Sequence, residues 1–149
     1  MTRAGIDFSF VNSWFGSSLN SNGFVFASTF KGESTISNSR IAGNFQSGVL
    51  INGGVQIALI GNQIVQNSNQ GLNLFAAVTV AANVTDFIIQ GNFLGGDAGI
   101  GSLQSHGAIV STGTSDFYVI QNNICHAQNV GTCVSDGGSG VNKVVTPNF

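Results

Sequence analysis

Five segments of the chain repeat one pattern, and this repeat constrains the fold more than any other feature of the sequence. Two copies match position for position, Asp86–Leu94 (DFIIQGNFL) and Asp116–Ile124 (DFYVIQNNI), and their spacing of about 30 residues is that of a solenoid repeat. Three further copies precede them, at Asp7–Phe15, Glu33–Ile41 and Gln56–Ile64. The period shortens to about 23 residues between the second and third copies, and repeats of this length indicate stacked copies of one supersecondary unit.

Each copy holds two apolar residues five positions apart, and this odd spacing requires a bend. Side chains alternate along a strand, so a straight strand would place the two on opposite faces. The pairs are Phe10/Phe15, Ile36/Ile41, Leu59/Ile64, Ile89/Leu94 and Val119/Ile124. Gly or Asn stands at the bend, as in Gly61-Asn62, and both residue types tolerate positive φ. We expect Asn62, Asn92 and Asn122 to stack as an amide ladder, continued by Ser13 and Ser39.

A glycine followed by alternating apolar positions completes each copy. These segments are Gly23–Phe26, Gly48–Ile51, Gly71–Leu74, Gly107–Val110 and Gly131–Val134. Each repeat is thus predicted to form a strand, a corner, a short strand, a turn and a third strand. The prediction is an all-β solenoid of about five coils, in one domain spanning 1–149, with repeats at about 7–32, 33–55, 56–85, 86–115 and 116–142. An antiparallel sandwich also uses short strands, but it would not require a repeating sequence.

Charged residues make up only 7% of the chain, which excludes some classes of function. A net charge of −2 with four Lys and Arg residues gives no basic patch for nucleic acid. Asn, Ser, Gly, Gln and Thr fill the polar positions, and such a surface suits sugars. No apolar stretch reaches the roughly 18 residues of a membrane helix, and residues 1–10 lack the pattern of a signal peptide. We therefore expect no nucleic-acid partner and no membrane insertion, and release from the cell by lysis or with a leader already removed.

The cysteines and histidines do not show the spacing of a metal site. Cys125 and Cys133 are too few for a disulfide scaffold, and we expect buried free thiols, with a local bridge as the alternative. His126 follows Cys125, but two Cys and two His in this arrangement do not form a zinc site. No metal and no cofactor are predicted.

The apolar-x-apolar-x-Gly-Asn-x-Ile unit, followed by a glycine-led strand, resembles the pectate-lyase-like β-helix superfamily. Its best-known members are phage tailspikes and polysaccharide-degrading enzymes, and the resemblance covers residues 7 to about 135. It implies a right-handed parallel β-helix, often trimeric in tailspikes, with a carbohydrate lying along one face. Members usually cap the N-terminal end, whereas the first repeat here starts at Asp7. We therefore expect a fragment of a longer protein, a subdomain, or a protomer that stacks on something else.

Two segments are longer than their equivalents, Phe75–Thr85 and Gly95–His106, and insertions in a solenoid often carry function. Glycoside hydrolysis needs two carboxyl groups about 5–9.5 Å apart. Four of the six acids open strands, where an acid commonly caps a turn: Asp7, Glu33, Asp86 and Asp116. Asp97 and Asp136 are left, and Gly96-Asp97 with Ser105-His106-Gly107 is similar to motifs of polygalacturonase-like β-helices. A second Asp and the basic partner of that family are missing. Asp97, His106 and Asp136 are the catalytic candidates, and catalysis by this chain alone is not favoured.

The binding candidates are Trp14 and Gln104. Trp14 is expected to face outward, where its ring could stack on a sugar. Five phenylalanines are expected to stack inside the coils: Phe15, Phe24, Phe26, Phe87 and Phe117. The prediction is a β-helix module of a tailspike-like or extracellular appendage protein, on a virion tail or outside the cell. It would form a homotrimer and bind cell-surface polysaccharide. The alternative is a polysaccharide hydrolase or lyase whose site is completed between protomers.

Overall fold

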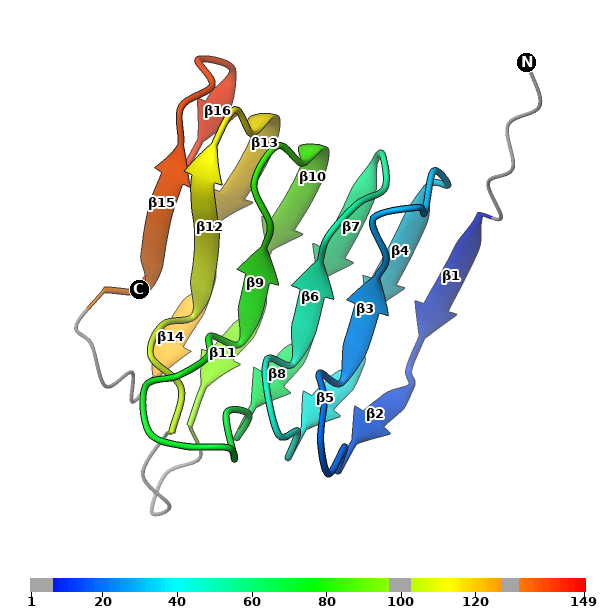
Figure 1. The fold of residues 1–149 in the computed structure, drawn as a ribbon, viewed down its shortest axis with the longest axis vertical. Coiled ribbons are helices and arrows are strands. Elements are labelled where there is room, and N and C mark those ends of the chain that lie inside the picture. Colours follow the sequence, from blue (N-terminus) through cyan, green and yellow to red (C-terminus); the bar gives the residue numbers. More distant parts are fainter. Residues whose placement is uncertain (1–6, 97–102, 127–131) are drawn as a thin grey trace.

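The computed structural model describes residues 7–96, 103–126 and 132–149, and they form a solenoid of about five coils (Figure 1). Sheet 1 has six strands, β1 (Phe8–Val11), β4 (Ser34–Ser37), β7 (Ile57–Ile60), β10 (Thr85–Gln90), β13 (Asp116–Gln121) and β16 (Lys143–Val144). Sheet 2 has five, β2 (Trp14–Gly16), β5 (Arg40–Ala42), β8 (Gln63–Val65), β11 (Phe93–Gly95) and β14 (Ile124–His126). Sheet 3 has β3 (Phe24–Phe26), β6 (Val49–Ile51), β9 (Val78–Val80), β12 (Ala108–Gly113) and β15 (Val134–Gly138).

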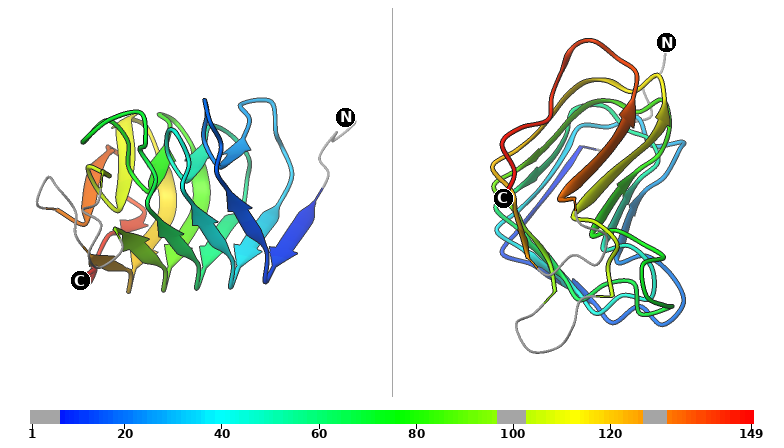
Figure 2. Two further views of the ribbon diagram at one scale, coloured as in Figure 1. Left: turned by 90° about the horizontal axis from the view of Figure 1, so that it is seen from below. Right: turned by 90° about the vertical axis from the view of Figure 1, so that its left-hand side faces the viewer.

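The coils wind in one direction, so every pairing between neighbouring coils is parallel. Viewed from the C-terminal end, the chain turns anticlockwise as it approaches the viewer, and the helix is therefore right-handed (Figure 2). The predicted all-β, right-handed parallel β-helix is confirmed. The described part of the chain contains no helix that is long and apolar enough to cross a membrane.

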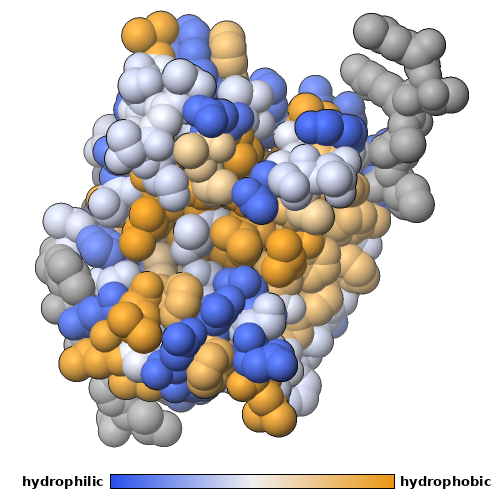
Figure 3. Space-filling model, viewed as in Figure 1, coloured by the Kyte–Doolittle hydropathy of each residue, from blue (hydrophilic) through white to orange (hydrophobic). Residues whose placement is uncertain are grey.

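The core lies between the three sheets and is built from the inward side chains of each strand. Aliphatic residues from successive coils lie above one another, for example Ile41 against Ile64 and Ile64 against Leu94. At Gly48 there is no room for a side chain, because a Cβ would approach Ile64 Cγ2 to 2.4 Å and Asn67 Nδ2 to 2.7 Å. Glycine at position 48 is thus a packing requirement. The outer face of sheet 3, toward the viewer in Figure 3, mixes hydrophobic and hydrophilic residues.

The amide ladder at the corner between sheets 1 and 2 is present, with one correction. Ser39 N donates to Asn62 Oδ1, Asn62 Nδ2 donates to Asn92 Oδ1 and Asn92 Nδ2 donates to Asn123 Oδ1, with donor–acceptor distances of 3.0 Å. Asn123 Nδ2 in turn donates to Asn148 Oδ1 at 2.8 Å. The fourth rung is therefore Asn123 and not the predicted Asn122, whose φ of 56° places it at the bend.

The same one-residue shift changes which residues of the fifth repeat face inward. Ile89 pairs with Ile120 and Leu94 with Cys125, so the fourth and fifth copies are 31 residues apart and not the predicted 30. A shift of one position turns every side chain of a strand to the other face. Ile124, predicted to be in the core, is consequently 52% exposed. Phe117, predicted to stack inside, is 59% exposed.

Tyr118 takes the inward position that Phe117 was expected to fill. Its ring stacks on Phe87 at a centroid distance of 4.6 Å. The register follows from this stack, since a buried aromatic pair contributes more than a partly exposed one.

Two further corrections concern the third strand and the cysteines. Gly71–Leu74 lies in a turn, and the strand is Val78–Val80, inside the segment that was predicted to be an insertion. Ala77, immediately before it, takes the place that Gly48 and Gly107 have in neighbouring coils. The third strand of the last coil begins at Val134, while the predicted start at Gly131 lies outside the described residues.

Cys125 and Cys133 form a disulfide with a Cα–Cα distance of 5.3 Å, so the prediction of free thiols is wrong. Cys125 continues the inward column of Leu94, and Cys133 takes the position of Gly107. A Cβ at Gly107 would lie 2.5 Å from Cys125 Sγ, which shows how closely the two columns approach at this turn.

Candidate functional site

The outer face of sheet 2 carries one row of aromatic, cationic and amide side chains, one from each coil. The strand register aligns Trp14, Arg40, Gln63, Phe93 and Ile124. Parallel strands are about 4.8 Å apart, so Trp14 and Phe93 stand about 14 Å apart along the stack. The row exists because each of these residues immediately precedes an inward core residue of the short strand.

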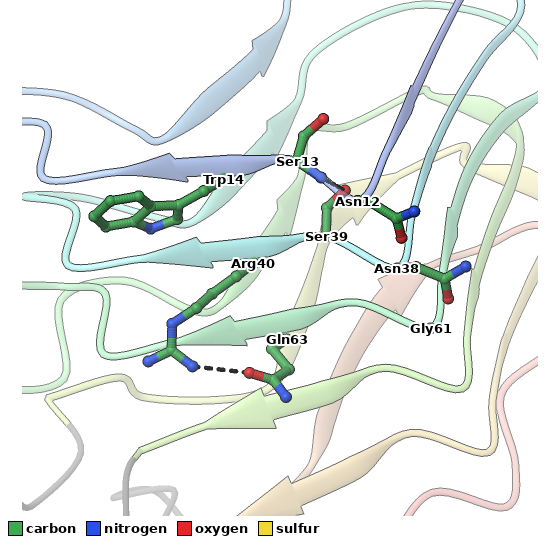
Figure 4. A pocket seen from close by; sticks show the side chains of 8 residues that line it. All are labelled: Asn12, Ser13, Trp14, Asn38, Ser39, Arg40, Gly61 and Gln63. Carbon is green, nitrogen blue, oxygen red and sulfur yellow. Dashed lines mark hydrogen bonds between the residues drawn. The ribbon is translucent and has the colours of Figure 1, made fainter.

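A groove of about 470 Å³ runs along the N-terminal part of this row (Figure 4). Its lining is polar apart from one ring: Asn12, Ser13, Trp14, Asn38, Ser39, Arg40, Gly61 and Gln63. Arg40 Nη1 donates a hydrogen bond of 2.8 Å to Gln63 Oε1, which holds the guanidinium along the row. Arginine has five N–H donors, so this bond leaves most of its donor capacity for a ligand.

Trp14 is 73% exposed, and its ring lies beside a glycine of its own strand. A Cβ on Gly16 would come within 2.9 Å of Trp14 Nε1 and 2.6 Å of the Ala42 carbonyl. The next outward row, which contains Gly16, Ala42, Val65 and Gly95, has small side chains in these positions. Gly16 thus has no side chain that could cover the indole, and Ala42 and Val65 are buried, in agreement with the exposure of Trp14.

A second hollow of about 230 Å³ lies on the other side of the Arg40–Gln63 pair. It is lined by Arg40, Gln63, Val65, Phe93 and Gly96. The Phe93 ring is 6.3 Å from the His126 ring, centroid to centroid. The two hollows together give an exposed strip with an aromatic ring toward each end and hydrogen-bonding groups between them.

This arrangement fits a ligand that has both apolar faces and many hydroxyl groups. Aromatic rings offer flat apolar area with little loss of conformational entropy, and Arg and Gln side chains supply donors and acceptors between them. Among the residues that the structure describes, those that line the two hollows include no carboxylic acid and no imidazole. The described part of the strip therefore has groups suited to binding.

Of the sequence-predicted catalytic candidates, Asp97 lies outside the described residues, and the structure places the other two on different elements. His106 is half-buried in the turn before β12. Burial lowers the pKa of its imidazole. Its Nδ1 atom is buried, with no hydrogen-bond partner within the described ranges. Asp136 lies in β15, in the last coil.

Asp136 is held by three neighbours and belongs to the packing of the last coil. Its Oδ1 accepts a 2.5 Å hydrogen bond from the Tyr118 hydroxyl, and its Oδ2 pairs with Lys143 Nζ at 2.8 Å. Burial alone would raise the pKa of Asp136, but hydrogen bonds from Lys143, Tyr118 and the Gly138 amide outweigh it and lower this pKa. Burial, and then the hydrogen bond to Asp136, raise the pKa of Tyr118. A carboxylate that is ionised and paired in this way is not a proton donor.

Gln104, the second binding candidate, is fully buried. Its Oε1 accepts from Asn67 N at 3.0 Å, and Asn67 Oδ1 accepts from Asn44 Nδ2 at 2.9 Å. These residues form a second amide ladder, at the turn between sheets 2 and 3, which sequence reasoning missed. The signal was present, because Asn44 and Asn67 are 23 residues apart, as are Ser39 and Asn62 in the first ladder. Over the residues that the structure covers, no cluster of three or more His, Cys, Asp or Glu could hold a metal ion.

The fold and the site define a right-handed parallel β-helix with an exposed aromatic and amide strip. No family model matches the sequence, and no curated protein matches it. Among solved structures, the A-module of the mannuronan C-5 epimerase AlgE6 from Azotobacter vinelandii is similar, with a TM-score of 0.69 and 18% sequence identity. The match covers 96% of this chain and 36% of that one, so this chain spans about a third of its length. At this identity the likeness shows the fold alone.

Proposed function

We propose that this chain is a polysaccharide-binding β-helix module. The observation that carries the proposal is the outward row of sheet 2, in which Trp14, Arg40, Gln63 and Phe93 follow one another along two connected hollows. A long chain of sugar rings matches a strip to which each coil contributes one side chain. The structural neighbour is consistent with the proposal, since it is named as a module of a mannuronan epimerase and mannuronan is a polysaccharide.

We further propose that the module acts on a phage tail or outside the cell, as a homotrimer of tailspike type. Two features support an extracellular place. The surface is nearly uncharged, and the Cys125–Cys133 disulfide is of a kind that persists in oxidising surroundings. We propose binding in preference to hydrolysis or lyase chemistry, because none of the described residues that line the strip is an acid.

The single tryptophan provides a direct test. Trp14 is the only indole, and it is exposed, so its fluorescence should shift to shorter wavelength when a sugar ring covers it. Mannuronan and dextran serve as an anionic and a neutral probe, titrated separately. Arg40→Ala keeps the reporter and should weaken binding about tenfold, a loss of about 1.4 kcal/mol.

Binding by Trp14→Ala is measured by affinity electrophoresis, as retarded migration in gels that contain one of the polysaccharides. Leu72→Ala is the matched control. Leu72 is also exposed, but it lies in a turn away from the strip. Retarded migration that is lost in Trp14→Ala and kept in Leu72→Ala supports the site. Unchanged fluorescence with both probes, together with equal migration of all variants, contradicts it.

A further inference from the structure

The outward row of sheet 2 continues beyond Phe93 into the last coils and becomes apolar there. One backbone hydrogen bond recurs along the row, because the amide of each member donates to the carbonyl of the ladder residue one coil earlier. The donor–acceptor distances are 2.8 Å for Phe93 N to Asn62 O, 2.9 Å for Ile124 N to Asn92 O and 2.9 Å for Phe149 N to Asn123 O. Phe149 lies outside the strands, but the same bond makes it the next member of the row after Ile124.

Packing inside the solenoid does not account for the apolar side chains at these positions. Ile124 is 52% exposed and Phe149 is 72% exposed. Arg40 and Gln63, which occupy the same row in the second and third coils, are polar and exposed as well. The coil therefore accepts a polar residue at this position. A bound ligand would account for Ile124 and Phe149, since adjoining exposed apolar side chains mark interaction sites.

The apolar row is one side chain wide, and this width restricts what can bind. Asn122 stands at the bend on one side, while Gly95 and His126 take the next outward positions on the other side. Three members of the row, from Phe93 to Phe149, span about 10 Å along the stack. A standard protein interface buries about 800 Å² on each partner, far more than a single file of three side chains offers. A polymer chain that lies along the stack fits this shape.

The row is continuous with the polysaccharide strip, so one chain can cross both halves. The half that holds Trp14, Arg40 and Gln63 offers hydrogen bonds, whereas the side chains from Phe93 onward offer none. Aromatic rings stack on many sugars, but the branched Ile124 side chain has no flat face for stacking. Hydroxyl groups over this half would lose hydrogen bonds to water without replacement, whereas methyl groups would gain from burial. The apolar half therefore favours a sugar that carries methyl groups.

A hydrogen-bond donor beside the apolar row narrows the class of ligand further. In the first hollow, Asn12 at the bend lines the same groove as Trp14, two residues later in the chain. Asn122 has the same relation to Ile124 in the fifth coil, where it is exposed and its φ of 56° marks the bend. A side-chain amide donates hydrogen bonds, so a carbonyl group next to the methyl group would find a partner there. A methyl group joined to a carbonyl group is an acetyl group.

We infer that the polysaccharide carries acetyl groups, as esters or as acetamido groups, and that Ile124, Phe149 and Asn122 bind them. The inference rests on the proposed function and adds the chemical class of the sugar. A buried methyl group changes affinity about fourfold, so contact with two acetyl groups should give a preference of about tenfold.

Trp14 fluorescence measures this preference, because the indole lies in the other half of the strip and is kept in every variant. Partly acetylated dextran is titrated against the same sample after mild alkali has removed its esters. The wild type should bind the acetylated form about tenfold more tightly. Ile124→Ser and Phe149→Ser should each reduce the preference to about threefold or less. Both should leave the affinity for the deacetylated form and the circular dichroism spectrum unchanged.

Two further variants serve as a test of the donor and as a control. Asn122→Gly suits the positive φ, as Gly61 and Gly91 do at neighbouring bends, and it removes the amide. It should lower the affinity for the acetylated form about fivefold and leave the deacetylated form unaffected. Leu72→Ser, in an exposed turn away from the row, should keep the full preference.

Glycol chitin distinguishes the two linkages, because it carries the acetyl group as an acetamido group. A greater loss of glycol chitin binding than of acetylated dextran binding in Ile124→Ser would assign the row to acetamido sugars. The reverse would assign it to acetyl esters, and either result supports the inference.

Equal affinity of the wild type for acetylated and deacetylated dextran would overturn the inference, as would a preference that survives in both Ile124→Ser and Phe149→Ser. Polysaccharide binding would persist in both cases, so the proposed function would stand. Absence of any fluorescence change with every polymer would contradict the proposed function and the inference together.

Discussion

Replacement of Asn92 by alanine should remove much of the stability of the solenoid. Asn92 is buried, and its side chain joins three coils. Its Oδ1 accepts from Asn62 N at 2.9 Å, and its Nδ2 donates to Leu59 O at 2.9 Å and to Asn123 Oδ1 at 3.0 Å. Alanine leaves the Asn62 N–H and the Leu59 carbonyl without these bonds, in a place that water does not reach. A buried group left unpaired costs about 1–3 kcal/mol, so the loss should be about 4 kcal/mol.

Thermal unfolding followed by circular dichroism measures this loss. For a chain of this size about 4 kcal/mol corresponds to a decrease in Tm of roughly 8–16 °C. Asn52→Ala is the control, because Asn52 is exposed, and it should change Tm by about 1–2 °C at most. Asn92→Asp is a second variant, since a carboxylate cannot donate to Leu59 or Asn123. It should be at least as destabilising at pH 7 and should recover part of the loss near pH 4. A decrease of less than about 3 °C for Asn92→Ala would refute the view that the ladder holds the corner together.

Two further predictions concern the last coil. The lowered pKa of Asp136 means that its stabilising contribution is present above the unfolded value near 4 and is lost as pH falls through the folded pKa. Asp136→Asn should therefore lower the free energy of unfolding by about 1–2 kcal/mol at pH 7, and by progressively less below about pH 4. Melting curves from pH 7 to 3 measure this loss. A loss that does not depend on pH would contradict the ion pair. Cys125 and Cys133 are 8 residues apart, so opening their bridge should cost about 2.5 kcal/mol. Melting with and without reductant checks this, and iodoacetamide should label both thiols only after reduction.

The sequence was sufficient for the fold because the solenoid repeats its constraints. Pairs such as Ile36/Ile41 and Leu59/Ile64 predicted a bend between two strands, and all four residues are fully buried. The glycine-asparagine corners predicted the amide ladder for the same reason, because every coil has to turn at the same corner between sheets 1 and 2. The strand register has the predicted spacing between the second, third and fourth copies, with Ile36 beside Leu59 and Leu59 beside Ile89.

The failures occurred where the repeat changes length. The fifth copy was aligned one residue short because Asp-Phe occurs in both segments, whereas the structure aligns Phe87 with Tyr118. The shared Asp-Phe pair favoured an alignment of Phe87 with Phe117, and this alignment wrongly predicted that the Phe117 ring is buried. The third strand of the third coil was misplaced because Gly71 was taken as the glycine that precedes the third strand in other coils. In this coil Ala77 has that position. Gly71 lies in a turn, where glycine is common for a different reason.

The site was less accessible to sequence reasoning than the fold, for a physical reason. Inward positions are restricted by volume, and so they repeat. Outward positions on sheet 2 are free to differ, and a row of Trp14, Arg40, Gln63 and Phe93 shows no repeat that a comparison of copies could detect. The row can be recognised only when the strand register is known. Its members are the residues immediately before the inward residues, such as Phe15, Ile41 and Ile64. Where the interior is this regular, differences between the outer rows carry the functional information, and the side chains on the face of sheet 2 can change without any change in the coils that support them.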